Sequence, residues 1–311
     1  MLKDGVSTLD KRAPVVTLAP NPRYWNKARM PKATFQFDNV ISKAEALDEV
    51  MKGGKVDIVT ELSVAEAKQV AKSKHAHVVE SKAKTVLVGV FNQKTTASKW
   101  NDVNLRKAVN IAVDRAQVVK NGMGGYGTVI PSMIMPGQFG SNPDLKPYAY
   151  NAGAAKKVFS KAGVSSVTIV AGEGYKGVVD AIAKSMAAAG VTVSSVAEAK
   201  GNDWDIMLVE HFDWSPEYPV GVVYREYFGE DGGFRKGPVD PNLADLFAKV
   251  YKATNKAKQE ELVRGIDKYV HDNAQVLLLP SPSKLYAVSN KVNFVPYKTT
   301  VLELAETTIK K

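Results

Sequence analysis

Cysteine is absent from this 311-residue chain. Its absence excludes disulfide bonds, thiolate metal ligands, cysteine nucleophiles and lipid attachment through a cysteine of this sequence. No apolar run approaches the roughly 20 residues that a membrane-spanning helix requires. The first residues, Met1–Gly5, also lack the apolar core of a secretory signal. We therefore expect that a signal has been removed or that the chain begins inside a longer one.

The remaining composition is that of an ordinary folded protein, with 45% apolar and 24% charged residues. The length suffices for one large or two medium domains with real cores. The net charge of +10 raises the question of nucleic-acid binding. However, the lysines are spread along the chain, and no dense basic block with interleaved aromatics occurs. We predict a solvated basic surface and no nucleic-acid partner, although the charge would favour an acidic surface or an anionic solute.

The first 80 residues predict a mixture of short strands and helices. Apolar alternation predicts strands over residues 14–19 and 34–38 and a short one over 56–59. A helix over 43–52 should end at Gly53-Gly54, which can adopt the left-handed conformation. Ser63 is a suitable N-cap for a second helix that ends near Lys72.

The central part of the chain alternates between strands and helices. Glycine and proline dominate residues 122–147, which predicts a long surface loop. We expect strands over 85–91, 167–170, 191–196 and 205–209, and helices over 104–113, 152–161 and 178–189, with a short helix that Asp114 caps and Gly122 closes. This alternation predicts an α/β lobe in which helices pack on a sheet.

The last third begins with a segment, residues 210–240, whose aromatics, glycines and prolines predict irregular structure. Two amphipathic helices should follow, one around Leu243–Tyr251 and one around Leu262–Val270. Apolar runs over 277–279 and 286–288 predict strands.

Several short motifs follow one another in the order found in a known family. Near the beginning they are Asn21–Trp25 (NPxYW in the family), Pro31–Phe35, Gly53–Ile58 (GEVDI) and Val90–Asn92 (xFN). They continue with Asp102–Val109 (DVRVRQAL), Ala112–Arg115 (AIDR), Gly124–Thr128, Met135–Gly137 with Asn142–Leu145 (PPG…DPDL), Lys258–Leu262 (KRxEL) and Leu277–Pro280 (PLY). The chain thus resembles the bacterial extracellular solute-binding proteins of family 5, the dipeptide, oligopeptide and nickel type, from about residue 14 to 305.

The resemblance implies an α/β fold of the periplasmic-binding-protein-like type II. Family members are longer, so it also implies that residues 83–283 form a complete second lobe. Residues 1–82 with 284–311 would then be the hinge-proximal remainder of lobe one. In the family, two lobes close around a solute.

The segment 210–219 carries the strongest implied binding residues. Asp213 matches the aspartate that, in the family, pairs with the α-amino group of a bound peptide. Charge-assisted hydrogen bonds of this kind are roughly twice as strong as neutral ones. Trp214, Tyr218 and His211 lie in the same segment, where aromatic walls suit a permissive site. An Asx turn that leads into a proline-rich loop is the alternative for Asp213, and core packing is preferred for Phe212.

Three further residues complete the predicted ligand-binding set. Phe91 and Asn92 lie where the family's strand faces the ligand, and Asn92 could hydrogen-bond a peptide backbone. Lys176 lies near the position at which some members place a carboxylate-binding arginine. A solvated lysine is the alternative at this position.

Other chemistries find little support. His75 and His77 lack further ligands at a suitable spacing, so we expect surface histidines and no metal site. His211 lies near acidic residues, but no positioned serine accompanies it. Gly122–Gly127 lacks the lysine of a phosphate-binding loop and follows a helix, which argues against a nucleotide site. We expect no enzyme activity and no cofactor.

We therefore predict the substrate-binding component of an ABC importer, which captures a small solute such as a peptide and works with a membrane permease. The expected location is periplasmic or extracellular, with membrane association through a missing N-terminal segment. The alternative is a truncated relative that self-assembles into a homo-oligomer, or binds a partner, through exposed lobe-one edges.

Overall fold

The computed structural model describes residues 15–30, 32–82, 85–212, 222–296, 304 and 306–310. The chain divides into two compact units. Unit 1 comprises residues 1–83 and 283–311, and unit 2 comprises residues 84–282. Both crossings between the units fall next to the positions at which the sequence predicts a lobe boundary.

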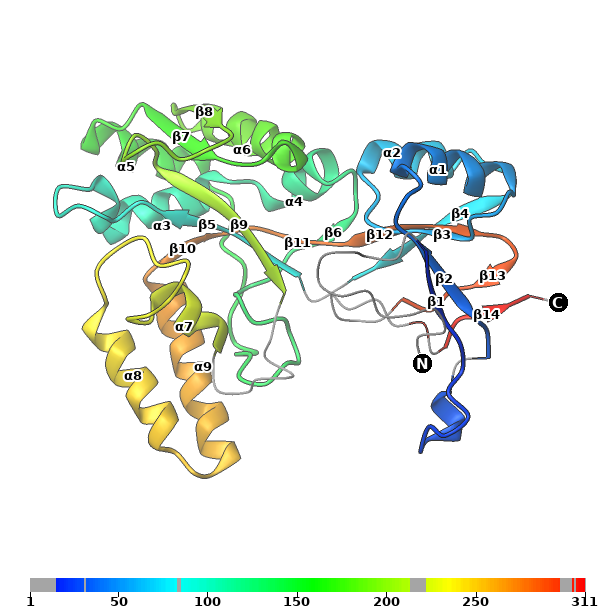
Figure 1. Cartoon of the computed structure of the whole chain (residues 1–311). Helices are drawn as coiled ribbons and strands as arrows, with labels where there is room; N and C mark the ends of the chain where they lie inside the picture. The colour runs from blue at the N-terminus through cyan, green and yellow to red at the C-terminus, as the bar shows by residue number, and fades with distance from the viewer. Residues whose placement is uncertain are drawn as a thin grey trace. The chain divides into compact units, whose positions relative to one another are not determined.

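Unit 2 is built on a five-stranded sheet in the order β10-β5-β9-β7-β8 (Figure 1). These strands are β5 (Thr85–Phe91), β7 (Ser166–Val170), β8 (Thr192–Val196), β9 (Ile206–Phe212) and β10 (Val276–Leu278). β5 pairs antiparallel with β9 and β10, whereas β7 pairs parallel with β8 and β9. All seven residues of β5 are buried, because both faces of the sheet are covered.

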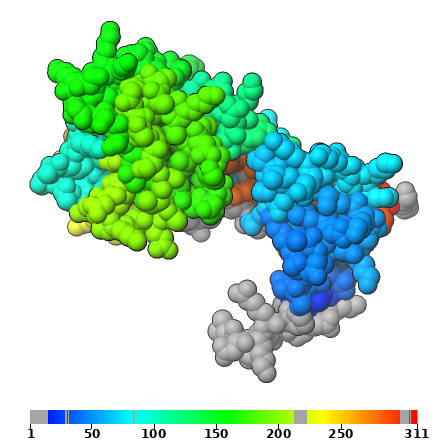
Figure 2. Space-filling view, turned by 90° about the horizontal axis from the view of Figure 1, so that it is seen from above, coloured from blue at the N-terminus to red at the C-terminus, as the bar shows by residue number. Residues whose placement is uncertain are grey.

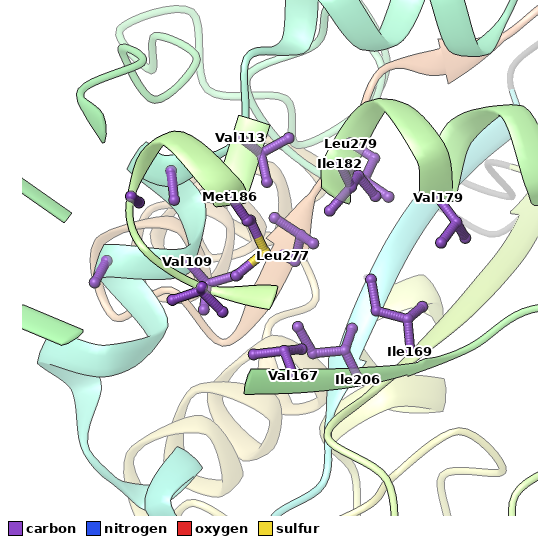
Figure 3. Packing of buried hydrophobic residues seen from close by; sticks show 14 of the residues in the cluster. Val109, Val113, Val167, Ile169, Val179, Ile182, Met186, Ile206, Leu277 and Leu279 are labelled. Atoms are coloured by element: carbon purple, nitrogen blue, oxygen red, sulfur yellow. The ribbon is translucent and has the colours of Figure 1, made fainter. Parts of the chain in front are cut away.

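One face of this sheet carries α3 (Val103–Ala112), α5 (Ala152–Ala162) and α6 (Lys176–Ala188). Val109 of α3 and Met186 of α6 lie close to Leu277 of β10 in the core between them (Figure 3). Seen from the side of these helices, the green atoms of residues 152–196 cover much of unit 2 (Figure 2). The helix–strand alternation of the sequence thus yields the predicted α/β layers.

The opposite face packs on α7 (Val222–Phe228), α8 (Pro241–Lys252) and α9 (Lys256–Asp272). The strand period of two explains this division, because Val86, Val88 and Val90 of β5 join this second core while Leu87 and Phe91 join the first. The two amphipathic helices of the sequence analysis are confirmed as α8 and α9. The prediction of irregular structure over 210–240 is wrong in two places, since β9 extends to Phe212 and α7 forms a two-turn helix.

The glycine-rich segment between the helical layers is largely the predicted loop. A short helix α4 (Arg115–Gln117), capped by Asp114, runs into a π-helical turn, η3 (Val118–Gly122). Within the loop, β6 (Gly127–Thr128) pairs with β11 (Ser281–Pro282). The 3₁₀ turns of unit 2 are η2 (Lys99–Asn101) and η4 (Glu173–Tyr175).

Unit 1 contains a three-stranded antiparallel sheet in the order β3-β12-β4. Its strands are β3 (Ile58–Val59), β12 (Lys284–Ser289) and β4 (Ala76–Ser81), and both helices, α1 (Lys43–Lys52) and α2 (Val64–Val70), pack on β12. Two further strand pairs join β1 (Val15–Leu18) to β2 (Phe35–Asp38) and β13 (Val292–Asn293) to β14 (Thr308–Ile309), and η1 (Lys27–Arg29) is a 3₁₀ turn.

Two predicted helix ends of unit 1 are confirmed, the end of α1 at Gly53 and the N-cap of α2 at Ser63. Ser42 and Ser63 each form a capping box with the glutamate three residues later, which satisfies backbone N–H groups at the start of α1 and α2. Gly53 ends α1 with a φ of 73°, a left-handed conformation that side chains with a Cβ disfavour. In the described part of the chain, none of the helices has both the length and the apolar character needed to cross a bilayer.

Candidate functional site

The end of β9 places two ionisable side chains on opposite faces of the unit 2 sheet. The Tyr175 hydroxyl donates a hydrogen bond of 2.6 Å to Oε2 of Glu210. Burial and this contact raise the pKa of Tyr175 above its ordinary value, which keeps the phenol protonated. On the other face, Nδ1 of His211 lies 2.6 Å from the Tyr227 hydroxyl.

His211 is a half-buried histidine that is uncharged in this arrangement. Burial lowers its pKa to about 4, so the imidazole is neutral at pH 7. Its ring lies 5.0 Å from that of Tyr227, centroid to centroid. The remaining nitrogen, Nε2, is buried and has no hydrogen-bond partner among the residues that the structure describes, which is unusual for a buried polar atom.

Three residues of the predicted set, Asp213, Trp214 and Tyr218, lie outside the described residues. Their contacts with a solute remain predictions. The described chain on either side of them is well packed, because Glu210 contacts Tyr175 and α7 begins at Val222. The predicted loop thus connects the end of a central strand to a helix of the second core.

Lys176 opens α6 at the same end of the sheet, next to Tyr175. Its ammonium group pairs with Asp180 at 3.0 Å, and both side chains are well exposed. Such an exposed pair contributes little to stability. The structure therefore places Lys176 in the neighbourhood of Glu210 with its side chain at the surface.

Phe91 and Asn92 lie at the opposite end of the β5–β9 pair. The backbone N–H of Asn92 donates to the carbonyl of Asp205, whereas His211 lies opposite Val86. At about 3.3 Å per residue, some 20 Å of strand separates these two levels. The structure therefore places Phe91 and Asn92 about the length of a strand away from His211.

The side chains of Phe91 and Asn92 have structural partners at that end. Phe91 is buried with its ring 5.2 Å from that of Trp100. The Asn92 amide donates to the carbonyls of Trp204 at 3.0 Å and Asn202 at 3.3 Å. These bonds hold the chain entering β9 against the end of β5, and a ligand contact by either residue remains a prediction.

Sequence reasoning missed a cleft of about 560 Å³ at this same end. Its lining comes from two loops, one after β5 and one before α8, which are more than a hundred residues apart in the chain: Gln93, Lys94, Thr95, Thr96, Asn101, Arg235, Lys236, Gly237 and Pro238. A neighbouring hollow of about 170 Å³ includes Asn92 and Asp205. No spacing pattern in the sequence connects the two loops.

The remaining histidines lie as the sequence predicts. His75 and His77 are exposed, and His77 contacts the side-chain oxygen of Asn290 at 2.9 Å. This confirms their interpretation as surface histidines. Over the ranges that the structure describes, no three or more His, Asp or Glu side chains gather as metal ligands.

Comparison with known proteins gives the class to which this fold belongs. The family model described as bacterial extracellular solute-binding proteins, family 5, matches residues 8–234. The chain therefore belongs to this family. That result confirms the resemblance carried by the ordered motifs of the sequence.

Individual relatives are distant. The nickel-binding periplasmic protein of Escherichia coli is 22% identical over 251 residues, which cover 70% of this chain and 47% of that protein. The structure of NikA from Brucella suis in complex with Fe(III)-EDTA has a TM-score of 0.79 at 16% identity, covering 97% of this chain and 67% of that one. DppA from Helicobacter pylori in complex with the peptide STSA has a TM-score of 0.72 at 19% identity, covering 100% and 62%.

These matches confirm the predicted α/β fold of periplasmic-binding-protein-like type II. The chain spans about half the length of the curated relative and about two thirds of the solved structures. The matched proteins are binding proteins, which confirms the prediction that the chain is not an enzyme. The comparisons give no support to the alternative of a self-assembling structural protein.

Proposed function

We propose that this chain captures a small solute for an ABC importer and releases it unchanged to a membrane permease. The observation that carries the proposal is the family match over residues 8–234, in a chain whose fold follows solute-binding proteins over nearly its whole length. The family description also supports a periplasmic or extracellular location.

The solute that we propose is a short peptide. The relatives differ in what their names record, since one is nickel-binding and another holds a peptide. A peptide is favoured by Asp213, the residue that matches the family's partner for the α-amino group. Trp214 and Tyr218 would cover the peptide side chains without demanding one geometry.

The described residues support this location in one respect. Residues 213–221 come between β9, the central strand of the sheet, and α7, and both of these elements belong to the packed part of unit 2. Tyr175, Glu210 and Lys176 add polar groups at the same end of the sheet. A loop held by rigid elements is a common position for binding residues.

The proposal is tested with the 311-residue chain and a pool of short peptides. The chain is incubated with the pool and repurified, and retained peptides are identified by mass spectrometry and titrated by calorimetry. Asp213→Asn removes the charge that pairs with the ammonium group at nearly constant size. We expect it to weaken binding by about 2 kcal/mol or more, roughly 30-fold, because a desolvated ammonium is left unpaired.

Asp144→Asn is the matched control, because Asp144 is an exposed aspartate in the same unit. It should leave the affinity unchanged. Equal affinities of the Asp213 and Asp144 variants would remove Asp213 from the site. Retention of a metal complex or haem in place of any peptide would replace the proposed solute class.

A further inference from the structure

The cleft at the far end of the unit 2 sheet is positively charged and lies at the opposite end of β9 from His211. It is formed where the loop after β5 meets the loop before α8, and both loops lie at one end of the unit (Figure 1). Its lining contains Lys94, Lys236 and Arg235 and no carboxylate. By the strand register, this end is about 20 Å from the level of His211.

The two loops are fastened to each other by backbone contacts. The N–H of Gln93 donates to the carbonyl of Lys236 at 2.8 Å. Gly237 allows this approach, because a Cβ at its position would lie 2.7 Å from Cβ of Gln93. The Asn101 amide donates to the carbonyls of Thr95 and Thr96, both at 3.1 Å, which shapes the other wall. The cleft is therefore preformed.

Arg235 supports the second wall. Its Nη1 donates to the carbonyl of Gly237 at 2.6 Å and its Nη2 to that of Glu230 at 3.0 Å. Its Nε is buried and has no partner within the described part of the chain. The guanidinium group thus donates its hydrogen bonds to carbonyl oxygens. Because these oxygens belong to neutral peptide groups, they do not neutralise its positive charge. It contributes positive potential to the cleft and keeps the loop in place.

Among the described residues, neither Lys94 nor Lys236 pairs with a carboxylate, and Lys94 lies 5.6 Å from the ring centre of Trp204. Two carboxylates of the same unit pair with other cations, since Asp205 pairs with Lys99 at 2.9 Å and Asp231 pairs with Arg225. Three cations therefore share one cleft without a counter-ion from the described protein.

We propose that this cleft binds a small oxyanion, a phosphate or carboxylate group, free or carried by a small molecule. The lysine ammonium groups would pair with the anion, and the Thr95 and Thr96 hydroxyls and the Gln93 amide can donate hydrogen bonds. The volume of about 560 Å³ admits a molecule larger than phosphate, such as a tricarboxylate. This site does not depend on the identity of the transported solute.

The test titrates inorganic phosphate and citrate into the chain by isothermal calorimetry at fixed ionic strength. We expect saturable binding with a Kd of about 1 mM, because the two ammonium groups remain partly solvated. The double variant Lys94→Gln/Lys236→Gln should weaken binding by about tenfold. Higher sodium chloride should weaken binding to the unaltered chain, since exposed ion pairs are screened.

The matched control is Lys120→Gln/Lys252→Gln, which removes the same charge from two exposed lysines that do not line the cleft. It should bind within about twofold of the unaltered chain. Circular dichroism establishes that both double variants are folded. A Gly237→Ala variant gives an independent perturbation, because separating the two loops should also weaken binding.

Three results would overturn the proposal. The first is no saturable heat with either anion up to about 50 mM, well above the expected affinity. The second is equal binding by the Lys94/Lys236 variant and the unaltered chain, and the third is an equal loss in the control variant, which would reflect net charge alone. Peptide retention by the Lys94/Lys236 variant is measured in parallel, so that failure here is distinguished from failure of the proposed transport function.

Discussion

Two desolvated ionisable groups in unit 2 are expected to change the free energy of unfolding in opposite directions when the pH falls. Desolvation of the half-buried His211 ring on β9 lowers its pKa to about 4. Asp267 on α9 has no exposed surface, and desolvation raises its pKa to about 6, although hydrogen bonds from Tyr224 and from the N–H of Asn142 lower it. Both belong to the α7–α9 side of the sheet.

The signs of the two contributions are opposite. Between pH 6.5 and 4, His211 is protonated in the unfolded chain but not in the folded protein, so stability is lost as the pH falls. Between pH 6 and 3.8, folded Asp267 keeps a proton that the unfolded chain releases, so stability is gained as the pH falls. From pH 7 to pH 4.5 each contribution amounts to about 2 kcal/mol, and they nearly cancel.

Removing either group should expose the effect of the other. His211→Gln keeps an acceptor for Tyr227, and Asp267→Asn keeps an acceptor for Tyr224. For each protein, the quantity compared is the change in the free energy of unfolding when the pH falls from 7 to 4.5. For His211→Gln we expect this change to be about 2 kcal/mol more favourable to folding than for the unaltered chain. For Asp267→Asn, the change over the same pH interval should be about 2 kcal/mol less favourable to folding than for the unaltered chain.

The assay is urea unfolding at both pH values, followed by circular dichroism, with the free energy of unfolding extrapolated to water. His75→Gln, at an exposed position, serves as the control and should follow the unaltered chain. If the free energy of unfolding of His211→Gln changes with pH as that of the unaltered chain does, His211 is not a desolvated neutral histidine and the reasoning fails. If the free energy of unfolding of Asp267→Asn changes with pH as that of the unaltered chain does, the Asp267 carboxyl group does not titrate near pH 6.

Two further changes test the packing. Arg115 is buried and donates to the carbonyls of Asn110, Val113 and Tyr148. Arg115→Lys lacks the guanidinium group that makes these bonds, so it should lower the free energy of unfolding by about 3 kcal/mol. A loss below about 0.5 kcal/mol in urea unfolding would contradict this role. Ser63→Ala removes the N-cap of α2 and should cost about 1 kcal/mol, measured by hydrogen exchange in that helix, whereas the exposed Ser160→Ala should leave it unchanged.

Local structure was largely predictable, because short-range rules govern it. Ser42, Gly53 and Ser63 mark helix ends through bonds within a few residues. The apolar run 85–91 predicts a strand, and its burial on both faces follows from having no polar position. The ordered motifs predicted the family, and the family match confirmed it.

The helix α7 was not predictable from its neighbourhood. Its residues, Val222–Phe228, follow a stretch of prolines and aromatics whose local preference is irregular. The helix is stabilised by tertiary burial, since Tyr224 and Tyr227 are almost fully covered in the second core. Helices this short owe their stability to packing more than to propensity.

The sequence by itself determined most of the helices and strands, some of the helix caps and the family to which the chain belongs. The tertiary structure decided which side chains meet: it buried His211 against Tyr227, separated Asn92 from it by the length of a strand, and joined Lys94 to Lys236 across one cleft. Secondary structure follows from contacts between near neighbours in the chain. A site depends on register and loop docking between distant segments, which no local pattern encodes.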